Sequence, residues 1–238
     1  MQIKDSVIFI TGANGGLGTA LIDCALERGA AKVYAGMRTI DAARPWPQQV
    51  TPVRLDVTNQ GQVHTAAELA ADVDILINNA GLNHCQALLA ATNGEAARQE
   101  MEVNYFGTLA MCRAFAPLLA PRQGSIVNIL SILARISLPM MGSLCASKAA
   151  GLRLTDALRA ELAGQQVNVI GVLPGVIDTT MSSDFPPPKA TPQAVAEAIL
   201  DGILRDEEEI YPDGMSQAVA RRLLQERDQV RTEFSAFL

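Results

Sequence analysis

Short apolar runs alternate with longer amphipathic stretches along the whole chain, and this alternation limits the possible folds more than any other feature. The apolar runs are rich in β-branched residues and nearly continuous, as expected for strands of a parallel sheet covered on both faces. The repeated strand–helix–strand order predicts an α/β fold with a doubly wound parallel sheet and helices on both faces. Strands are expected at residues 6–10, 32–35, 50–55, 75–78, 125–130 and 167–173, and helices at 17–28, 62–71, 95–119, 142–163, 192–204 and 216–237.

No linker, repeat or low-complexity stretch divides the 238 residues, so a single domain spanning residues 1–238 is expected. Hydrophobic residues make up 49% of the chain, which is enough to build one large core. The one break in composition is the proline run 186–188, which excludes the interiors of helices and strands. We expect a substrate lid around it, at residues 178–190, and a closing helix at 216–237 that caps the domain.

Charge and composition exclude several classes of partner. The net charge is -6 at pH 7 and aromatic residues are only 4% of the chain, whereas nucleic-acid binding requires clustered cations and stacking rings. No apolar stretch reaches the ~20 residues of a membrane span, and the first residues do not form a secretory signal. The four cysteines are far apart, with no histidine at metal-ligand spacing. A cytoplasmic protein with reduced thiols, no metal site and a solvated acidic run at 206–209 is expected.

A glycine-rich turn follows the first expected strand and leads directly into the first helix. It has the sequence TGANGGLG from Thr11 to Gly18. Glycines in this position let a pyrophosphate approach bare backbone, and the helix N-terminus presents unpaired N–H groups to the phosphates. The spacing of Gly12, Gly16 and Gly18 is not the commonest dinucleotide fingerprint, G-x-G-x-x-G. Glycines chosen only for their backbone angles are the alternative, but the strand–turn–helix setting favours a dinucleotide site.

The end of the second strand indicates which nicotinamide dinucleotide binds. A site for NAD(H) places an acidic residue about 20 positions after the glycine turn, to hold the ribose 2′-hydroxyl. This chain has Gly36-Met37-Arg38-Thr39 there, without a carboxylate. A guanidinium binds a 2′-phosphate in fork geometry. We therefore expect NADP(H) rather than NAD(H), with Arg38 at the 2′-phosphate, and an ordinary solvated arginine is the alternative.

With this turn, several further segments make the chain resemble the short-chain dehydrogenase/reductase family over almost all of its length. They are Leu55-Asp56-Val57, Asn78-Asn79-Ala80-Gly81, Asn104 in VNYFG, Ser131 after the fifth strand, Lys148 in ASKAA, and Pro174-Gly175 with Thr179 after the sixth strand. These segments follow the carboxyl ends of expected strands, the edge at which open α/β sheets bind ligands. The resemblance implies a Rossmann-like fold of the classical type. Independently of the family, Asn78 and Asn79 suit a turn whose side chains tie neighbouring strands by hydrogen bonds.

The resemblance also implies roles for individual residues. Ser131 would polarise the substrate, Lys148 would bind the ribose, and Asn104 would hold the proton relay. Asp56 and Val57 would flank the adenine. The residues expected to bind the cofactor are Gly12, Asn14, Gly16, Leu17, Gly18, Arg38, Asp56, Val57, Asn79, Ala80, Gly81, Lys148, Pro174, Gly175, Ile177 and Thr179.

The chain departs from the family at the proton donor. The family has a tyrosine four residues before the lysine, one helical turn away on the same face, and its phenol exchanges a proton with the substrate oxygen. In this chain that position is Leu144, which has no proton to give. Leu144 lies 13 residues after Ser131, as the tyrosine does in the family, so the register is correct. Asn104, Ser131 and Lys148 are present, but the usual acid/base is missing.

Three explanations remain open for the missing tyrosine. A substitute donor could act, with His84 as the first candidate because it follows the turn at 78–81. Tyr105 and Cys145 are weaker candidates, since each points about 100° around its helix from the neighbouring site position. The substrate could need little protonation, as an iminium or polarised double bond, or receive a proton from water relayed by Lys148 and Ser131. The chain could instead be a degenerate member that binds nucleotide for a regulatory or structural role.

The sequence therefore predicts an NADP(H)-dependent oxidoreductase with a non-standard acid/base, acting on a small carbonyl or alcohol or a related C=N or C=C group. Met140, Met141, Met181 and Phe185 would line the cleft, which favours an apolar substrate. The family usually assembles through two long helices, which correspond here to 95–119 and 142–163. A homodimer or homotetramer is therefore expected. A nucleotide-binding protein without turnover is the alternative.

Overall fold

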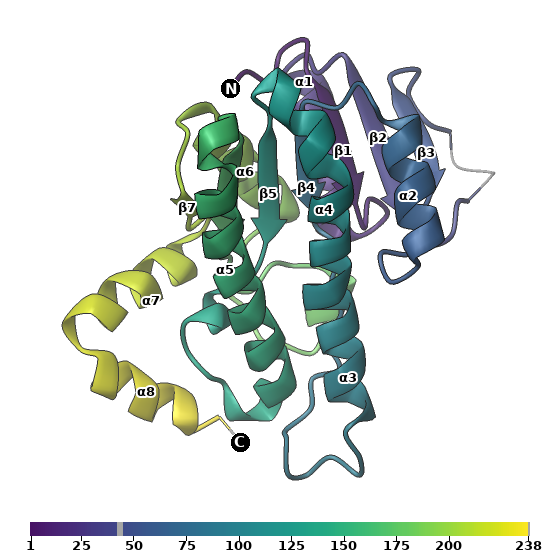
Figure 1. Ribbon diagram of the computed structural model, residues 1–238. Coiled ribbons are helices and arrows are strands. Elements are labelled where there is room, and N and C mark those ends of the chain that lie inside the picture. The colour runs from purple at the N-terminus through teal and green to yellow at the C-terminus, as the bar shows by residue number, and fades with distance from the viewer. Residues whose placement is uncertain (42–44, 238) are drawn as a thin grey trace.

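A seven-stranded parallel β-sheet forms the centre of the computed structural model, which describes residues 1–41 and 45–237 (Figure 1). The strand order is β3-β2-β1-β4-β5-β6-β7. The strands are β1 Val7–Thr11, β2 Lys32–Met37, β3 Val50–Arg54, β4 Ile75–Asn78, β5 Ser125–Ile129, β6 Asn168–Val172 and β7 Glu209–Ile210. Because the order reverses between β1 and β4, a crevice is expected beyond their carboxyl ends, where doubly wound sheets bind ligands. The predicted fold class, a single doubly wound α/β domain, is confirmed.

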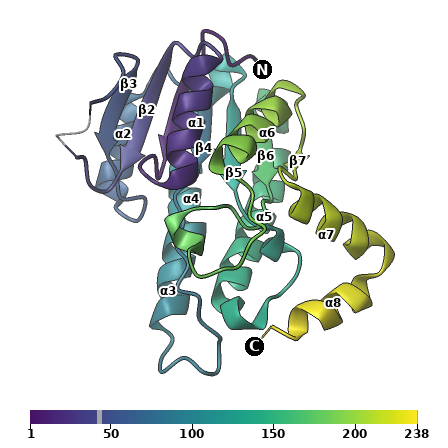
Figure 2. The ribbon, with the colours of Figure 1, turned by 180° about the vertical axis from the view of Figure 1, so that it is seen from behind.

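Helices cover both faces of the sheet (Figures 1 and 2). One face is covered by α2 Gln60–Leu69, α4 Thr108–Leu119 and α5 Gly142–Leu162, and the other by α1 Gly16–Glu27 and α6 Pro192–Leu204. In β1, Phe9 packs edge-on against Phe115 of α4, with ring centroids 4.9 Å apart. Phe9 and Phe115 belong to one hydrophobic core. The neighbours of Phe9, Ile8 and Ile10, belong to another core, which contains the buried residues of α1 and α6. Burial on both faces explains why the strands are apolar at consecutive positions.

The helix predicted at 95–119 is divided by a π-helical segment. The parts are α3 Glu95–Met101, the π segment η1 Glu102–Gly107, and α4. A Cβ on Gly107 would lie 2.6 Å from Val57 Cγ2, so the segment packs closely on the loop after β3. Apolar periodicity does not reveal such a local change of helical pitch. Asn104 lies inside the segment, and π segments are frequent at functional sites.

The prediction of a single closing helix at 216–237 is wrong. The structure has two helices, α7 Gly214–Gln225 and α8 Arg227–Ser235. They meet at Glu226, whose φ of -144° and ψ of 46° are not helical. The Arg222 guanidinium binds Glu226 and donates to both carboxylate oxygens of Glu233, at 2.6 and 2.7 Å. The apolar spacing continues through the bend, so periodicity misses it, and both helices form an arm beside the main body (Figure 1).

The sequence prediction omits β7, because Glu209–Ile210 has only two residues and begins inside the acidic run 206–209. The expectation that this run is fully solvated is also wrong at Glu209. That carboxylate is half-buried, binds the Arg135 guanidinium, and accepts a hydrogen bond from the Tyr211 hydroxyl at 2.8 Å.

Short 3₁₀ helices occur at the ends of longer elements and in loops. They are η2 Ala120–Arg122, η3 Ile132–Ala134, η4 Pro139–Met141, η5 Ala163–Gln165 and η6 Thr180–Ser182. Within residues 1–41 and 45–237, no helix has the length and apolar character needed to cross a membrane.

Candidate nucleotide-binding and catalytic site

The glycine-rich turn connects β1 to α1, and backbone contacts determine its shape. Gly12 has a φ of +62°, in the left-handed region that favours glycine. The amide of Ala13 donates to the carbonyl oxygen of Gly36 in β2, at 3.1 Å. A Cβ on Gly18 would lie only 2.3 Å from the carbonyl oxygen of Gly12, so α1 begins directly behind the turn. Close backbone packing therefore requires glycine at positions 12 and 18.

The outer side of the same turn fits a pyrophosphate. Asn14, Gly15 and Gly16 are exposed, whereas Leu17 is buried against the sheet. Gly15 is the N-cap of α1 and has no side chain to satisfy the first N–H groups, which can bind an anion instead. A Cβ on Gly16 would lie 2.8 Å from Thr179 Cγ2, so the loop after β6 lies against this surface. Bare backbone and a helix N-terminus are the features that the phosphates of a dinucleotide need.

The turn at residues 78–81, which follows β4, is hydrogen-bonded to the glycine turn. The Thr11 hydroxyl accepts from the amides of Asn79 and Ala80, both at 2.9 Å. Asn79 Nδ2 donates to the carbonyl oxygens of Thr11, at 3.0 Å, and Gly12, at 3.1 Å. These four bonds hold the two turns together where the strand order reverses.

A chain of buried polar side chains connects β4 to α5. Asn78 Nδ2 donates to Asn128 Oδ1 of β5, and Asn128 Nδ2 donates to Thr155 Oγ1 of α5, both at 2.9 Å. Thr155 Oγ1 in turn donates to the carbonyl oxygen of Gly151, at 2.8 Å. The predicted role of Asn78 in tying neighbouring strands is confirmed. The same bonds fix α5, the helix of Lys148, to the centre of the sheet.

The residues predicted to hold the adenosine end lie after β2 and β3. The Leu55 amide donates to the carbonyl oxygen of Met37, at 2.8 Å, which joins these strand ends. Arg38 follows directly and is exposed. Asp56 Oδ1 accepts from the Thr58 hydroxyl at 2.7 Å, and Val57 is buried. Arg38 and Asp56 therefore lie at the ends of two adjacent strands.

The loops after β5 and β6 are also joined. Ser131 Oγ caps η3 by accepting from the Leu133 amide, at 3.1 Å. The Ile132 amide donates to the carbonyl oxygen of Pro174, at 2.9 Å. The Gly175 amide donates to Asp213 Oδ2, at 2.7 Å, which attaches the loop after β6 to the start of α7.

Asn104 is buried, and both the oxygen and the nitrogen of its side-chain amide form hydrogen bonds. Its Oδ1 accepts from the Leu82 amide at 2.8 Å, and its Nδ2 donates to the Leu82 carbonyl oxygen and to Ser147 Oγ, both at 2.9 Å. Ser147 Oγ donates to the carbonyl oxygen of Leu144, at 2.9 Å. Asn104 thus holds the loop after β4 against α5.

Lys148 extends from α5 to the end of β5. Its Nζ donates to the carbonyl oxygen of Ile129, at 2.9 Å. A Cβ on Gly81 would lie 3.6 Å from Lys148 Nζ and 3.5 Å from Asn104 Oδ1, so the three residues converge. Burial lowers the pKa of Lys148 to about 8, although the charge of Glu100 acts in the opposite direction. A lysine with this pKa exchanges protons near neutral pH, which suits acid–base chemistry.

Leu144 lies one helical turn before Lys148 and is 7% exposed. The first candidate for a substitute donor, His84, is exposed, and its Nε2 lies 2.9 Å from Gln99 Oε1 on α3. The structure therefore places the imidazole against the surface of α3. Its role as a proton donor stays a prediction.

The two weaker candidates also have partners of their own. The Tyr105 ring packs edge-on against Phe106, with centroids 5.0 Å apart. Cys145 Sγ accepts from the Leu138 amide at 3.2 Å, and burial raises the pKa of its thiol. Both side chains therefore pack against neighbouring residues, and their roles as proton donors stay predictions.

The segment predicted as a lid, residues 178–190, is joined at its base. Ile177 and Ala190 form a parallel bridge, and the Asp178 amide donates to the Ala190 carbonyl oxygen at 2.8 Å. Within the segment, Lys189 Nζ donates to the carbonyl oxygen of Ser182, at 2.7 Å. Figure 2 shows it as the light-green loop between β6 and α6, below α1. Because Thr179 lies against Gly16, this segment begins beside the exposed side of the glycine turn.

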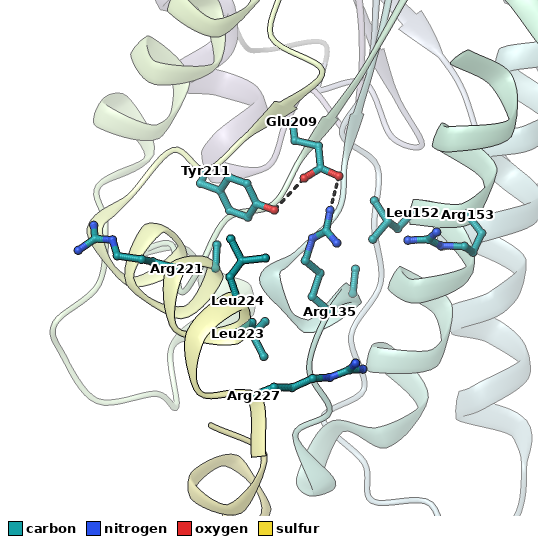
Figure 3. A pocket seen from close by; sticks show the side chains of 11 residues that line it. Arg135, Leu152, Arg153, Glu209, Tyr211, Arg221, Leu223, Leu224 and Arg227 are labelled. Atoms are coloured by element: carbon teal, nitrogen blue, oxygen red, sulfur yellow. Dashed lines mark hydrogen bonds and ion pairs between the residues drawn. The ribbon is translucent and has the colours of Figure 1, made fainter. Parts of the chain in front are cut away.

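A separate hollow of about 620 Å³ lies beside the arm formed by α7 and α8 (Figure 3). Its lining includes Arg135, Glu209 and Tyr211, which form the hydrogen-bonded group described above, together with Leu152 and Leu223. None of the predicted site residues lines this hollow.

Comparison with known proteins agrees with this geometry. The family described as short chain dehydrogenase matches residues 6–190. The chain belongs to this short-chain dehydrogenase family. Membership makes it an NAD(P)-dependent oxidoreductase.

Three relatives show how close the similarity is. A short-chain dehydrogenase from Burkholderia cenocepacia J2315, solved in complex with NADP, is 50% identical with a TM-score of 0.95, covering 98% of this chain and 99% of that chain. A 3-ketoacyl-(acyl-carrier-protein) reductase from Brucella melitensis, complexed with NADH, is 25% identical with a TM-score of 0.81, covering 90% and 98%. The Dehydrogenase/reductase SDR family protein 7-like of Drosophila melanogaster is 31% identical, covering 92% of this chain and 76% of that protein.

Sequence reasoning missed two residues of this short-chain dehydrogenase. Thr11 joins the two turns through its hydroxyl, and its place at the end of a strand directly before a glycine turn was the available signal. Glu100 is fully buried, and its Oε1 accepts from the His84 amide at 2.6 Å. Its spacing of four residues before Asn104 puts both on one helix face, but it does not predict burial.

Proposed function

We propose that this short-chain dehydrogenase is an NADP(H)-dependent oxidoreductase acting on a small, apolar carbonyl or alcohol, or on a related C=N or C=C group. The convergence of Lys148, Asn104 and Gly81 beside a glycine turn shaped for a dinucleotide supports this proposal most directly. The acid/base is non-standard, because Leu144 occupies the position one turn before Lys148. The Lys148 ammonium and the Ser131 hydroxyl are two groups at this edge that can deliver a proton, directly or through a relayed water.

When bound, NADP(H) supplies or accepts the hydride. Gly12, Gly16 and Gly18 would leave room for its pyrophosphate, and Lys148 would bind its ribose. Ser131 would hold and polarise the substrate oxygen. The complex of the 50% identical Burkholderia relative with NADP supports this choice of cofactor.

The proposed activity is tested by mixing the purified protein with NADPH or NADH and a panel of ketones, aldehydes and imines. We expect substrate-dependent loss of reduced nicotinamide absorbance, faster with NADPH and with apolar substrates. Failure of both dinucleotides to bind at millimolar concentration would remove the basis of the proposal.

Replacing Arg38 with alanine is expected to weaken NADPH binding by about 10- to 100-fold, the value of charge-assisted hydrogen bonds. NADH lacks the 2′-phosphate, so its affinity should not change. Calorimetric titration of both dinucleotides measures the difference. Arg221→Ala, at an exposed position on α7, is the matched control and should leave both affinities as in the wild type. Equal losses for NADPH and NADH in Arg38→Ala would rule out this role for Arg38.

A nucleotide-binding protein without turnover is the second candidate function. It is favoured by the apolar, buried side chain at position 144, which has no group able to transfer a proton. Restoring the phenol at this position distinguishes an inactive enzyme from one with a different chemistry.

We also propose that the chain forms a homodimer or homotetramer through the helices that the family uses for assembly. Their counterparts are the run of α3, η1 and α4 and the helix α5, which cover the same face of the sheet and pack together through α3 and η1 (Figure 1). Light scattering of the purified protein should give two or four times the chain mass of 25.3 kDa, and a monomer mass would contradict this assignment.

A further inference from the structure

Glu100 is a buried carboxylate that the proposed reaction does not yet use. The residue is 0% exposed, although its neighbours on α3 carry their charges at the surface. Its Oε1 accepts from the His84 amide at 2.6 Å. Its Oε2 is also buried, and no donor in the described part of the chain binds it. A buried carboxylate with one unsatisfied oxygen is costly unless another charge compensates it.

Glu100 belongs to a helix that packs against α5, the helix of Leu144 and Lys148. Glu100 lies on α3 one helical turn before Asn104, and Asn104 bonds to Ser147 of α5. α3 and α5 pack against each other. One turn back along α5 from Lys148 is Leu144, so Glu100 and Leu144 occupy corresponding turns of neighbouring helices.

The loop after β4 connects Glu100 to Lys148, since its Gly81 lies beside Lys148 Nζ and its His84 amide binds Glu100. The negative charge of Glu100 raises the pKa of the Lys148 ammonium and partly offsets the effect of burial. The carboxylate also acts on the thiols of Cys145 on α5 and Cys85 in the loop after β4, and burial raises the pKa of both. The remaining titratable side chain on this loop is His84, whose ring is directed to Gln99.

Asp184 of the lid also acts on Cys85. The charge of Glu100 thus acts on the pKa values of Lys148, Cys145 and Cys85. Lys148 is the cation among these three groups.

We propose that Glu100 is a positioning residue that keeps the Lys148 ammonium charged, so that Lys148 donates the proton that the missing tyrosine would have supplied. This inference rests on the proposed oxidoreductase function. In carbonyl reduction, the substrate carbon takes the hydride while the carbonyl π bond breaks. One N–H bond of Lys148 breaks and one O–H bond forms on the substrate oxygen. The neutral amine then regains a proton from solvent, and the reduced nicotinamide has been oxidised.

The sign of the pH dependence follows from this arrangement. The ammonium is the active form in reduction, so the rate falls as pH rises through the pKa of Lys148, which is about 8. Removal of the Glu100 charge leaves burial unopposed and lowers that pKa further. The alkaline decline of the reduction rate therefore moves to lower pH.

Glu100→Gln tests the proposal, because the amide oxygen of glutamine can still accept from the His84 amide. The sequence has four lysines, Lys4, Lys32, Lys148 and Lys189, so lysine labelled with carbon-13 at Cε gives a simple NMR spectrum. Lys148→Met identifies the Lys148 resonance by its loss. Titration of the cofactor-free protein then gives the pKa of Lys148 directly.

We expect the Lys148 titration to move to lower pH in Glu100→Gln and to stay in place in Glu102→Gln, which removes an exposed charge from the adjoining turn. In protein that reduces a substrate, the pH at which the reduction rate declines should move by the same number of pH units as the pKa of Lys148. Glu100→Asp keeps the charge farther from Lys148 and should titrate between wild type and the glutamine variant. If Glu100→Gln does not fold, the comparison of Glu100→Asp with the wild type still shows whether Glu100 affects the pKa of Lys148.

Identical Lys148 titrations in wild type, Glu100→Gln and Glu100→Asp would overturn the proposal. A shifted titration with an unmoved pH–rate profile would show that Lys148 is not the donor, and would overturn it too. Because the titration uses protein without cofactor, absence of dehydrogenase activity would refute the proposed function while leaving the coupling between Glu100 and Lys148 measurable.

Discussion

Replacing Leu144 with tyrosine is expected to raise the rate of carbonyl reduction, by about 10²–10⁴-fold if the wild type lacks a proton donor and by less if Lys148 already donates the proton. Position 144 lies one helical turn before Lys148, so a phenol there would lie on the same face of α5 as the ammonium. The nearby positive charge would favour ionisation of the phenol. The glycine turn is untouched, so NADPH affinity should not change. Steady-state kcat/KM and calorimetric Kd measure the two effects.

Leu144→Phe is the matched control, since it adds the ring without the hydroxyl. Leu144 is 7% exposed, so the larger ring is expected to cost about 1–3 kcal/mol of stability in both variants. Only the tyrosine variant should gain activity. A gain from an inactive wild type indicates an enzyme that lost its proton donor. If the wild type reduces a substrate and the tyrosine variant does not, Leu144 belongs to a different chemistry, and equal rates in both variants would contradict the expected gain.

Replacing Gly18 with alanine is expected to lower the free energy of unfolding by about 1–3 kcal/mol and to abolish measurable NADPH binding. The added Cβ would lie 2.3 Å from the Gly12 carbonyl oxygen and 2.8 Å from Ala13 Cα. Both neighbours are backbone atoms, so the turn must shift as a whole. The shift would displace the backbone that faces the pyrophosphate. Denaturant unfolding and calorimetric titration measure the two losses.

Gly15→Ala tests whether the effect is specific to the packing of Gly18. Gly15 has a φ of -77°, which any residue adopts, and its added Cβ would contact only the Gly12 carbonyl oxygen, at an ordinary 3.4 Å. This variant should lose less stability than Gly18→Ala, since its main cost is that alanine is a poorer N-cap than glycine. If Gly18→Ala unfolds at the same denaturant concentration as Gly15→Ala, the backbone contact does not constrain the turn.

Most of the sheet and its helices could be predicted, because each long element has a periodic pattern and a local signal at its ends. The bounds of β4 and α6 agree with the prediction, and Thr191 caps α6 by accepting from the Ala194 amide at 3.2 Å. β7 could not be predicted, since two residues have no periodicity and the strand exists only by pairing with β6. The bend at Glu226 depends on the distant pair of Arg222 and Glu233, which apolar spacing does not encode.

The candidate site shows the same division. The glycine turn and the turn at 78–81 are visible in the sequence, because their residue types are required by local backbone geometry. The burial of Glu100 is not visible, because it depends on where the loop containing His84 folds against α3. The close approach of Lys148, Gly81 and Asn104 to one another likewise results from the packing of α5 against the sheet.

The two turns are joined through main-chain atoms and the side chains of Thr11 and Asn79, and none of these bonds involves the side chain at position 144. The residue at position 144 can therefore change without altering the bonds that hold the two turns together. A lineage with this architecture can exchange its proton donor by point substitution while the coenzyme platform persists. New reactions can therefore evolve on an old scaffold without passing through an unfolded or coenzyme-free ancestor.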